Sequence, residues 1–359
     1  MAQSSGKTLI VAINISFILG MFTYKFLFTG SSTQEPPAVE QVKQEVIPVV
    51  KKVAVTPVKK QPALPVTASN PNFGKPLNYR GAVTGTIRAL PNSKLPTTGI
   101  LVDLDTRKVL WAKNSRTAVP IASMTKMMTL LLAFESIADP RNNIEPQTIV
   151  KVTSEASKIG GSQVFLDPRE SLSLEKLLQA IAIKSANDAA YLVGQFLGNG
   201  TIGVFVKRMN KRAKELGMKS TQFNNPHGLP EASASRDNKS TPEDLIILAE
   251  QLLQYPDVLE LSSTYLAYLN NRYNYKTKKY DGKTQLVNTN RLVQNNKKNG
   301  GVLGVDGMKT GYIRRSGFCS TVTCKRGGRR LVAVVTGFSS SKNGRDPFVK
   351  KLLDWGYSH

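Results

Sequence analysis

A serine and a lysine lie three residues apart at Ser123 and Lys126, in the stretch SMTK. At this spacing on a helix, the hydroxyl and the amine project from the same face, one turn apart. A lysine in a dry pocket beside other cations loses proton affinity, so it can act as a general base on the serine. The spacing alone is common and recurs at Ser4–Lys7, Ser173–Lys176 and Ser339–Lys342. The apolar run MMTLLLAF sets Ser123 apart, because it predicts a buried helix with its lysine near the core.

Two further polar motifs follow along the chain. Ser185 and Asn187 flank one alanine between two predicted helices, and the same Ser-x-Asn spacing recurs at residues 341–343. Lys-Thr-Gly occurs once, at residues 309–311 within GVDGMKTGY. The glycines of this stretch let a backbone approach a ligand closely, and a strand edge there can pair with an extended peptide.

Strands are predicted near both ends of the folded part and helices between them. Alternating apolar residues indicate a first hairpin over residues 98–114 and a second over residues 317–338. Helical patterns cover residues 122–137, 173–183, 188–197, 204–216, 242–253 and 348–357. This order predicts an α+β fold in which the two ends of the chain build one antiparallel sheet around a helical middle.

Composition narrows the class of protein. The 359 residues are 40% hydrophobic and 21% charged, which excludes collagen-like, disulfide-scaffold and wholly disordered chains. Two cysteines exclude a disulfide framework, and two histidines disfavour a multi-histidine metal site. The formal net charge of +24 predicts attraction to polyanions, such as anionic wall polymers or lipid headgroups. The basic runs carry no interleaved aromatic residues, which disfavours nucleic acid.

Three segments are predicted. Residues 1–30 contain the uncharged run TLIVAINISFILGMFTY, which indicates an N-terminal membrane anchor or a removed signal. Residues 31–80 are rich in proline and lysine and indicate a flexible linker, so residues 81–359 form the folded domain. On either interpretation of the first segment, the folded domain lies outside the cytoplasm.

The three motifs, in this order, resemble the active-site triplet of low-molecular-mass penicillin-binding proteins, specifically the D-alanyl-D-alanine carboxypeptidase family. The stretches IASMTKMMT, IKSANDAA, TQFNNPHGLP, NTNRL and GVDGMKTGY also look like family blocks, and the resemblance covers about residues 97–357. It implies the fold of β-lactamases and penicillin-binding-protein transpeptidases. We therefore expect a five-stranded antiparallel sheet flanked by helices, with an all-helical subdomain.

The resemblance also implies catalytic roles. Ser123 would be the acylated nucleophile and Lys126 its base. Ser185 would relay a proton to the leaving amine. Asn187 would hold the peptide carbonyl of the substrate together with Lys126.

Further roles fall on the substrate-binding strand. Lys309 would help to depress the pKa of Lys126, and Thr310, in the motif completed by Gly311, would bind the terminal carboxylate. The backbone N–H groups of Ser123 and Tyr312 would form the oxyanion hole. Arg345, in Gly-Arg-Asp, would pair with the substrate carboxylate.

The implied enzyme is a serine-type D-Ala-D-Ala carboxypeptidase that trims peptidoglycan stem peptides through an acyl-enzyme, needs no metal or cofactor and is inhibited by β-lactams. It would be anchored to the cytoplasmic membrane by its N-terminus, with the catalytic domain in the cell envelope. A DD-endopeptidase that cleaves cross-links is the alternative. A β-lactamase is disfavoured, because no Glu-x-x-x-Asn pattern follows Asn187 at the expected place. A non-catalytic wall-binding protein is disfavoured because all three motifs are complete.

Four residues need separate interpretation. Ile313 stands where the family usually has threonine, so one hydroxyl near the carboxylate site is lost. His227 lies between proline and glycine, which indicates a turn rather than a catalytic histidine. Cys319 and Cys324 are five residues apart on a predicted strand, so they should point to opposite faces and stay unbridged.

Overall fold

The computed structural model describes residues 71–87, 95–296 and 300–359, all of which belong to one compact unit, residues 60–359. The predicted anchor, residues 1–30, and most of the predicted linker lie outside the described residues. Leu77 and Tyr79 already pack against the main hydrophobic core. The boundary at residue 80 stays a prediction.

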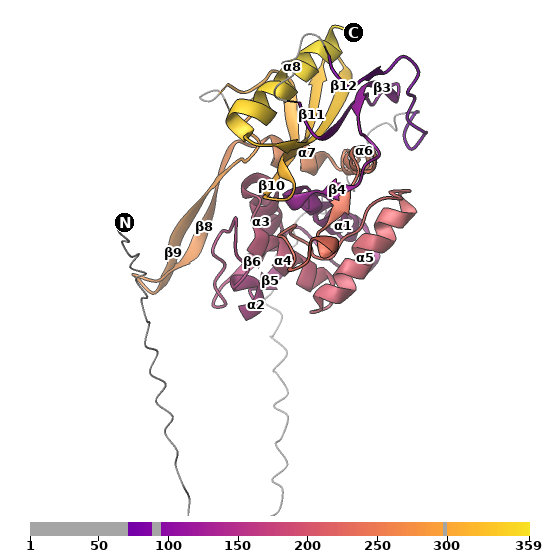
Figure 1. Cartoon of the computed structure of the whole chain (residues 1–359). Helices are drawn as coiled ribbons and strands as arrows, with labels where there is room; N and C mark the ends of the chain where they lie inside the picture. Colours follow the sequence, from indigo (N-terminus) through magenta and orange to yellow (C-terminus); the bar gives the residue numbers. More distant parts are fainter. Residues whose placement is uncertain (1–70, 88–94, 297–299) are drawn as a thin grey trace, which may run out of the picture. The chain divides into compact units, whose positions relative to one another are not determined.

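The two ends of the described chain form the expected sheet (Figure 1). Its strands run in the order β1-β3-β2-β12-β11-β10, and the five long strands are antiparallel to one another. The five long strands match the prediction, and a two-residue parallel edge strand makes a sixth that was not predicted. The bounds are β1 Val83–Thr84, β2 Thr98–Asp103, β3 Lys108–Lys113, β10 Val305–Ile313, β11 Gly317–Arg326 and β12 Arg329–Phe338.

Both faces of this sheet are buried, and successive side chains of a strand point alternately to one face and the other. On β2, Ile100 and Val102 belong to the core shared with the helical layer, whereas Leu101 belongs to a second core. The second core contains Phe348 and Leu352 of the last helix, α8 (Asp346–Tyr357). Figure 1 shows α8 on one side of the sheet and the other helices on the opposite side. The three sequence motifs lie where the edge strand β10 meets this helical layer.

The helical middle matches the predicted helices with shifted ends. Its main members are α1 Lys126–Ala138, α3 Leu174–Gln179, α4 Asn187–Leu197, α5 Ile202–Glu215 and α6 Pro242–Leu252. At the start of α6, the Thr241 hydroxyl accepts from the N–H of Asp244 at 3.1 Å, as the Ser-Thr-Pro sequence indicates. Two predictions need correction. A 3₁₀ turn, Ala122–Thr125, precedes α1, and a π-helical turn, Ala180–Lys184, continues α3.

Several elements were not predicted. A helix, α7 Pro256–Ser263, leads into a hairpin of β8 Leu266–Asn274 and β9 Lys279–Val287. Shorter pieces are α2 Ser154–Ser157 and the strand pairs β4 Val119–Pro120 with β7 Lys239–Ser240 and β5 Ile149–Lys151 with β6 Ser171–Ser173. The hairpin was missed because most of its side chains are polar and exposed.

Cys319 and Cys324 are both buried and unbridged. They lie in different cores, which confirms that they point to opposite faces of β11. In the described ranges, no single helix has the length and apolar composition to cross a membrane, although the bent pair α4 and α5, at 88°, meets those criteria jointly.

Candidate active site

The three sequence motifs meet at one cavity of about 300 Å³. Seven of the nine predicted site residues line it. Lys126 and Lys309 lie behind its wall, 0% and 1% exposed. The lining residues are Ser123, Gly161, Ser162, Ser185, Asn187, Gly228, Leu229, Thr289, Thr310, Gly311, Tyr312, Ile313, Phe318, Ser341 and Arg345. The cavity thus exposes Ser123 to a ligand while both lysines stay shielded from water.

The buried amine of Lys126 contacts the Ser123 hydroxyl. Its Nζ lies 3.0 Å from Ser123 Oγ, 2.6 Å from Asn187 Oδ1 and 2.6 Å from the backbone oxygen of His227. Among the described residues, none of its three partners is a carboxylate. Burial lowers the pKa of Lys126 well below its ordinary value, and the charge of Lys309 lowers it further, against a smaller opposing effect of Asp188. Both of these effects favour the neutral form of the amine.

Asn187 is held in one orientation. Its Nδ2 donates to the backbone oxygen of Gly160 at 2.7 Å, which directs Oδ1 toward Lys126. Its backbone N–H donates to the oxygen of Ser162 at 2.7 Å. The segment that ends in Gly160, Gly161 and Ser162 therefore positions the second motif.

His227 contributes through its backbone. The imidazole stacks on Tyr191, with ring centroids 6.3 Å apart, and its Nδ1 accepts from the N–H of Leu229 at 3.1 Å. Burial lowers the pKa of His227 to about 3, and the charge of Lys126 acts in the same direction. The ring is thus neutral and turned to other partners, as the turn interpretation predicted. That the His227 carbonyl would bind Lys126 was not predicted, and only the Pro-His-Gly turn signalled a fixed backbone there.

The Lys-Thr-Gly motif lies on β10, the edge strand of the sheet. Burial lowers the pKa of Lys309 to about 7, and the charge of Arg345 acts in the same direction. Its Nζ donates to the backbone oxygen of Thr310 at 3.1 Å. The Thr310 hydroxyl donates to that of Thr289 at 2.7 Å, so Thr289 is a cavity residue that the motifs did not reveal.

Gly311 brings the third motif against the first. A Cβ at Gly311 would lie 3.0 Å from the backbone nitrogen of Ser123, 3.1 Å from Ala122 Cβ and 2.9 Å from Cys319 Sγ. Only glycine lets the strand approach this closely. The next residue, Tyr312, is exposed at the cavity mouth and stacks on Phe318, with ring centroids 4.3 Å apart.

Ser185 and Ile313 complete the wall. Ser185 has a left-handed backbone, with φ of 62°, and its Oγ has no hydrogen-bond partner in the described part of the chain. Its hydroxyl is therefore available to a ligand. Ile313 lines the cavity with an apolar side chain. The cavity therefore lacks the hydroxyl that a threonine would supply at this position, as expected from the sequence.

Arg345 lines the cavity but already has protein partners. Its Nε and Nη2 lie 2.7 and 2.6 Å from Oδ1 of Asp346, and its Nη1 donates to the backbone oxygen of Cys319 at 3.2 Å. Arg291 donates to the other Asp346 oxygen. Asp346 therefore fixes the orientation of Arg345, the predicted partner of the substrate carboxylate. The sequence did not predict this ion pair between neighbouring residues.

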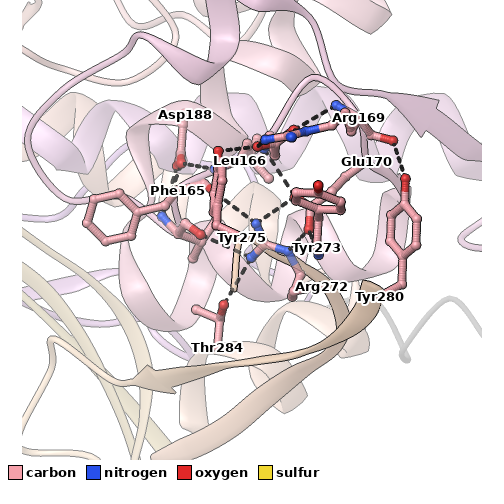
Figure 2. A network of polar contacts seen from close by, with 12 residues as sticks. Phe165, Leu166, Arg169, Glu170, Asp188, Arg272, Tyr273, Tyr275, Tyr280 and Thr284 are labelled. Atoms are coloured by element: carbon pink, nitrogen blue, oxygen red, sulfur yellow. Dashed lines mark hydrogen bonds and ion pairs between the residues drawn. The ribbon is translucent and has the colours of Figure 1, made fainter. Parts of the chain in front are cut away.

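The loop next to Asn187 is anchored by buried polar contacts (Figure 2). The Asp188 carboxylate accepts from the N–H groups of Val164 and Leu166 at 3.1 Å. Arg272 of β8 forms an ion pair with Glu170 and donates to the backbone oxygen of Val164 at 3.0 Å. These contacts join the β8–β9 hairpin to the loop that positions Asn187.

Comparisons with known proteins agree with the family resemblance of the three sequence motifs. A profile of the family described as D-alanyl-D-alanine carboxypeptidase matches residues 91–340. The chain is 40% identical over 259 residues to D-alanyl-D-alanine carboxypeptidase DacF of Bacillus subtilis, covering 72% of this chain and 61% of the relative. It is 31% identical over 271 residues to the D-alanyl-D-alanine endopeptidase of Haemophilus influenzae, covering 74% of this chain and 82% of the relative.

A similar solved structure is penicillin-binding protein D2 from Listeria monocytogenes in its ampicillin-bound form, with a TM-score of 0.61 and 28% identity. The match covers 75% of this chain and 100% of that one, and confirms the expected fold. The matches span 61% and 62% of the length of the carboxypeptidases DacF and DacD, from Bacillus subtilis and Escherichia coli. Since the profile spans most of the folded part, the chain belongs to the D-alanyl-D-alanine carboxypeptidase family.

Proposed function

We propose that this protein is a serine-type D-Ala-D-Ala carboxypeptidase that removes the terminal D-alanine from peptidoglycan stem peptides through an acyl-enzyme on Ser123. The observation that carries the proposal is the set of partners around Lys126 Nζ. Family membership supports the reaction class.

Burial favours a neutral Lys126 amine, and its three partners then leave the lone pair facing Ser123. A neutral amine has two N–H donors and one lone pair. Asn187 Oδ1 and the His227 carbonyl can only accept, so they take both N–H groups. In this neutral state the Ser123 hydroxyl, whose oxygen lies 3.0 Å from Nζ, donates its proton to the lone pair. Lys126 is thereby placed to take the serine proton as general base.

Acylation follows from this geometry. Ser123 Oγ attacks the carbonyl of the penultimate residue while its proton moves to Lys126. The backbone N–H groups of Ser123 and Tyr312 bind the resulting oxyanion. Ser185 then relays the proton taken by Lys126 to the leaving amine, the terminal D-alanine departs, and water hydrolyses the ester to restore Ser123.

The substrate carboxylate lies between Thr310 and Arg345. A guanidinium has five N–H donors, and Asp346 and the Cys319 carbonyl leave some of them free to reach a ligand. Asp346 also keeps Arg345 in place before the substrate arrives. β-Lactams would acylate Ser123 in the same pocket, a proposal supported by the ampicillin-bound Listeria relative.

The protein works in the bacterial cell envelope, held to the cytoplasmic membrane by residues 1–30, with the catalytic domain outside the cytoplasm. The apolar run in these residues supports this placement. The net charge of +24 supports contacts with anionic wall polymers.

A fluorescent penicillin tests the proposal on the full chain in detergent. We expect covalent labelling of the wild type and of Ser154→Ala, an exposed serine on α2, and no labelling of Ser123→Ala. The wild type should also release D-alanine from a pentapeptide that ends in D-Ala-D-Ala. Equal labelling of Ser123→Ala, or no D-alanine from the wild type, would contradict the proposal.

A DD-endopeptidase is the second candidate, because the match covers 82% of the Haemophilus endopeptidase against 61% of DacF. Cross-linked peptide dimers separate the two activities. Cleavage of dimers with the pentapeptide left intact would replace the first proposal by the second.

A further inference from the structure

Three tyrosines of the β8–β9 hairpin surround one arginine of the loop next to the cavity. Tyr273 makes edge-on contacts with Tyr275 and Tyr280, with ring centroids 5.4 and 5.5 Å apart. The guanidinium carbon of Arg169 lies 3.9 Å from the ring centroid of Tyr273 and 4.7 Å from that of Tyr275. Figure 2 shows these four residues together. We call Arg169, Tyr273, Tyr275 and Tyr280 the tyrosine–arginine shelf.

The rings of the shelf are fixed but uncovered. The Tyr275 hydroxyl donates to Asp167, and the Tyr280 hydroxyl donates to the backbone oxygen of Arg169 at 2.9 Å. Nevertheless, Tyr275 is 60% exposed and Tyr280 is 54% exposed. Aromatic surface that is ordered before a ligand arrives loses little entropy on binding, and this favours a recognition role.

The hairpin that carries the three tyrosines of the shelf is positively charged. Asp281 is the one acidic residue in the hairpin sequence, 266–287, and it accepts from the Thr277 hydroxyl at 2.9 Å. The exposed cations of the hairpin are Lys276, Lys278, Lys279 and Lys283. A complementary ligand therefore combines flat faces rich in C–H groups with negative charge.

The shelf shares a loop with the candidate active site. Arg169 belongs to the loop that starts at Gly161 and Ser162, both of which line the cavity. Arg272, next to Tyr273 on β8, is paired with Glu170 of this loop. A ligand on the shelf is thus bound to the structural unit that holds Asn187.

We propose that the tyrosine–arginine shelf binds the sugar strand of peptidoglycan, to which the stem peptides are attached. The sugar rings pack on the exposed faces of Tyr275 and Tyr280, and the lysines attract the carboxylates of neighbouring stem peptides. This inference rests on the proposed carboxypeptidase function. It adds a contact that a free peptide does not make and that polymeric substrate does.

Binding to insoluble peptidoglycan tests the shelf without requiring turnover. The parent is the full-length Ser123→Ala chain, and its affinity for peptidoglycan is measured by co-sedimentation. Replacing both Tyr275 and Tyr280 by alanine should lower this affinity about tenfold or more. Tyr280→Phe keeps the ring and should bind as strongly as the parent. Leu266→Ala removes an exposed apolar side chain of the same hairpin outside the shelf and should also bind like the parent. Unchanged binding by the double variant would overturn the proposal.

Turnover separates a binding surface from a structural role. With Ser123 intact, the double variant should release D-alanine from soluble pentapeptide at the wild-type rate, but about tenfold more slowly from polymeric peptidoglycan. Equal losses on both substrates would show a structural role and overturn the proposal. Loss of binding to anionic phospholipid vesicles, with peptidoglycan binding intact, would assign the shelf to a lipid surface instead. A wild type inactive on both substrates would contradict the proposed function, while peptidoglycan binding still decides on the shelf.

Discussion

Arg272 and Glu170 are 102 residues apart in the sequence and form a buried ion pair at two points, Nε to Oε1 and Nη2 to Oε2, each at 2.7 Å. Tyr273, next to Arg272, donates its backbone N–H to Glu170 Oε1 at 2.6 Å. The hairpin thereby fixes the loop whose backbone binds Asp188 and Asn187. The ion pair of the hairpin thus helps to determine where the Asn187 amide points.

Arg272→Met should lower the free energy of unfolding by about 3–5 kcal/mol, because it leaves the Glu170 carboxylate buried without its partner. It should also slow acylation, because the loop no longer holds Asn187 toward Lys126. Chemical denaturation and the rate of penicillin labelling measure the two effects. The control is Arg326→Met, which removes a partly exposed pair with Asp354 and should cost about 1 kcal/mol or less. Equal effects of the two variants would contradict the anchoring role.

Gly311→Ala should abolish or strongly slow acylation. The new methyl group would meet the Ser123 nitrogen at 3.0 Å and Cys319 Sγ at 2.9 Å, so β10 must move away from Ser123. Gly203→Ala on α5 is the matched control, because the nearest atom would lie 4.0 Å away and alanine favours a helix. We expect normal labelling and slightly higher stability for the control. A normal labelling rate of Gly311→Ala would show that this close approach is not required.

The sequence predicted those parts of the site in which a reactive or polar side chain has a role. One cavity is lined by four of these residues, Ser123, Ser185, Asn187 and Thr310. Their motifs occur in the order typical of one family, and the fold of that family brings them together. The role of the His227 carbonyl could not be predicted in this way, because every residue has a backbone oxygen. Turn residues predict where a backbone bends but do not reveal which side chain it will bind.

The β8–β9 hairpin escaped prediction for a further reason besides its polar, exposed side chains. Its pairing has two irregularities, between Leu269 and Arg272 and between Arg272 and Asn274, which break the alternation expected of a strand. Its buried position at Arg272 is held by an ion pair rather than by an apolar side chain. Arg345 shows the same limit, since pairing with its own neighbour Asp346 depends on local geometry that spacing does not encode.

Asn187→Asp tests whether the charge state of Lys126 controls acylation. The substitution puts a carboxylate in the place of an amide oxygen that lies 2.6 Å from Lys126 Nζ. Such a charge raises the pKa of Lys126, so more of the amine is protonated at neutral pH. Labelling should therefore slow at neutral pH and recover as the pH rises. Asn199→Asp, on an exposed turn, should label normally. A slow rate that does not change with pH would exclude this electrostatic explanation.

Lys309→Met tests the coupling between the two buried lysines through pH. The pKa of Lys309 is about 7 in the folded protein, against an ordinary value of 10.5. Between these pH values the unfolded chain binds a proton that the folded chain does not, so the wild type should become more stable as the pH rises. Methionine removes this contribution, and the melting temperature of the variant should depend less on pH above 7.

The same variant should shift the pH profile of acylation. The positive charge of Lys309 lowers the pKa of Lys126, so its removal lets that pKa rise. The pH of half-maximal penicillin labelling should therefore move upward, whatever the variant does to the maximal rate. Lys207→Met on α5 is the control and should leave both profiles unchanged. If the half-maximal pH of Lys309→Met equals that of the wild type, Lys309 acts on the substrate alone, and burial by itself keeps Lys126 neutral.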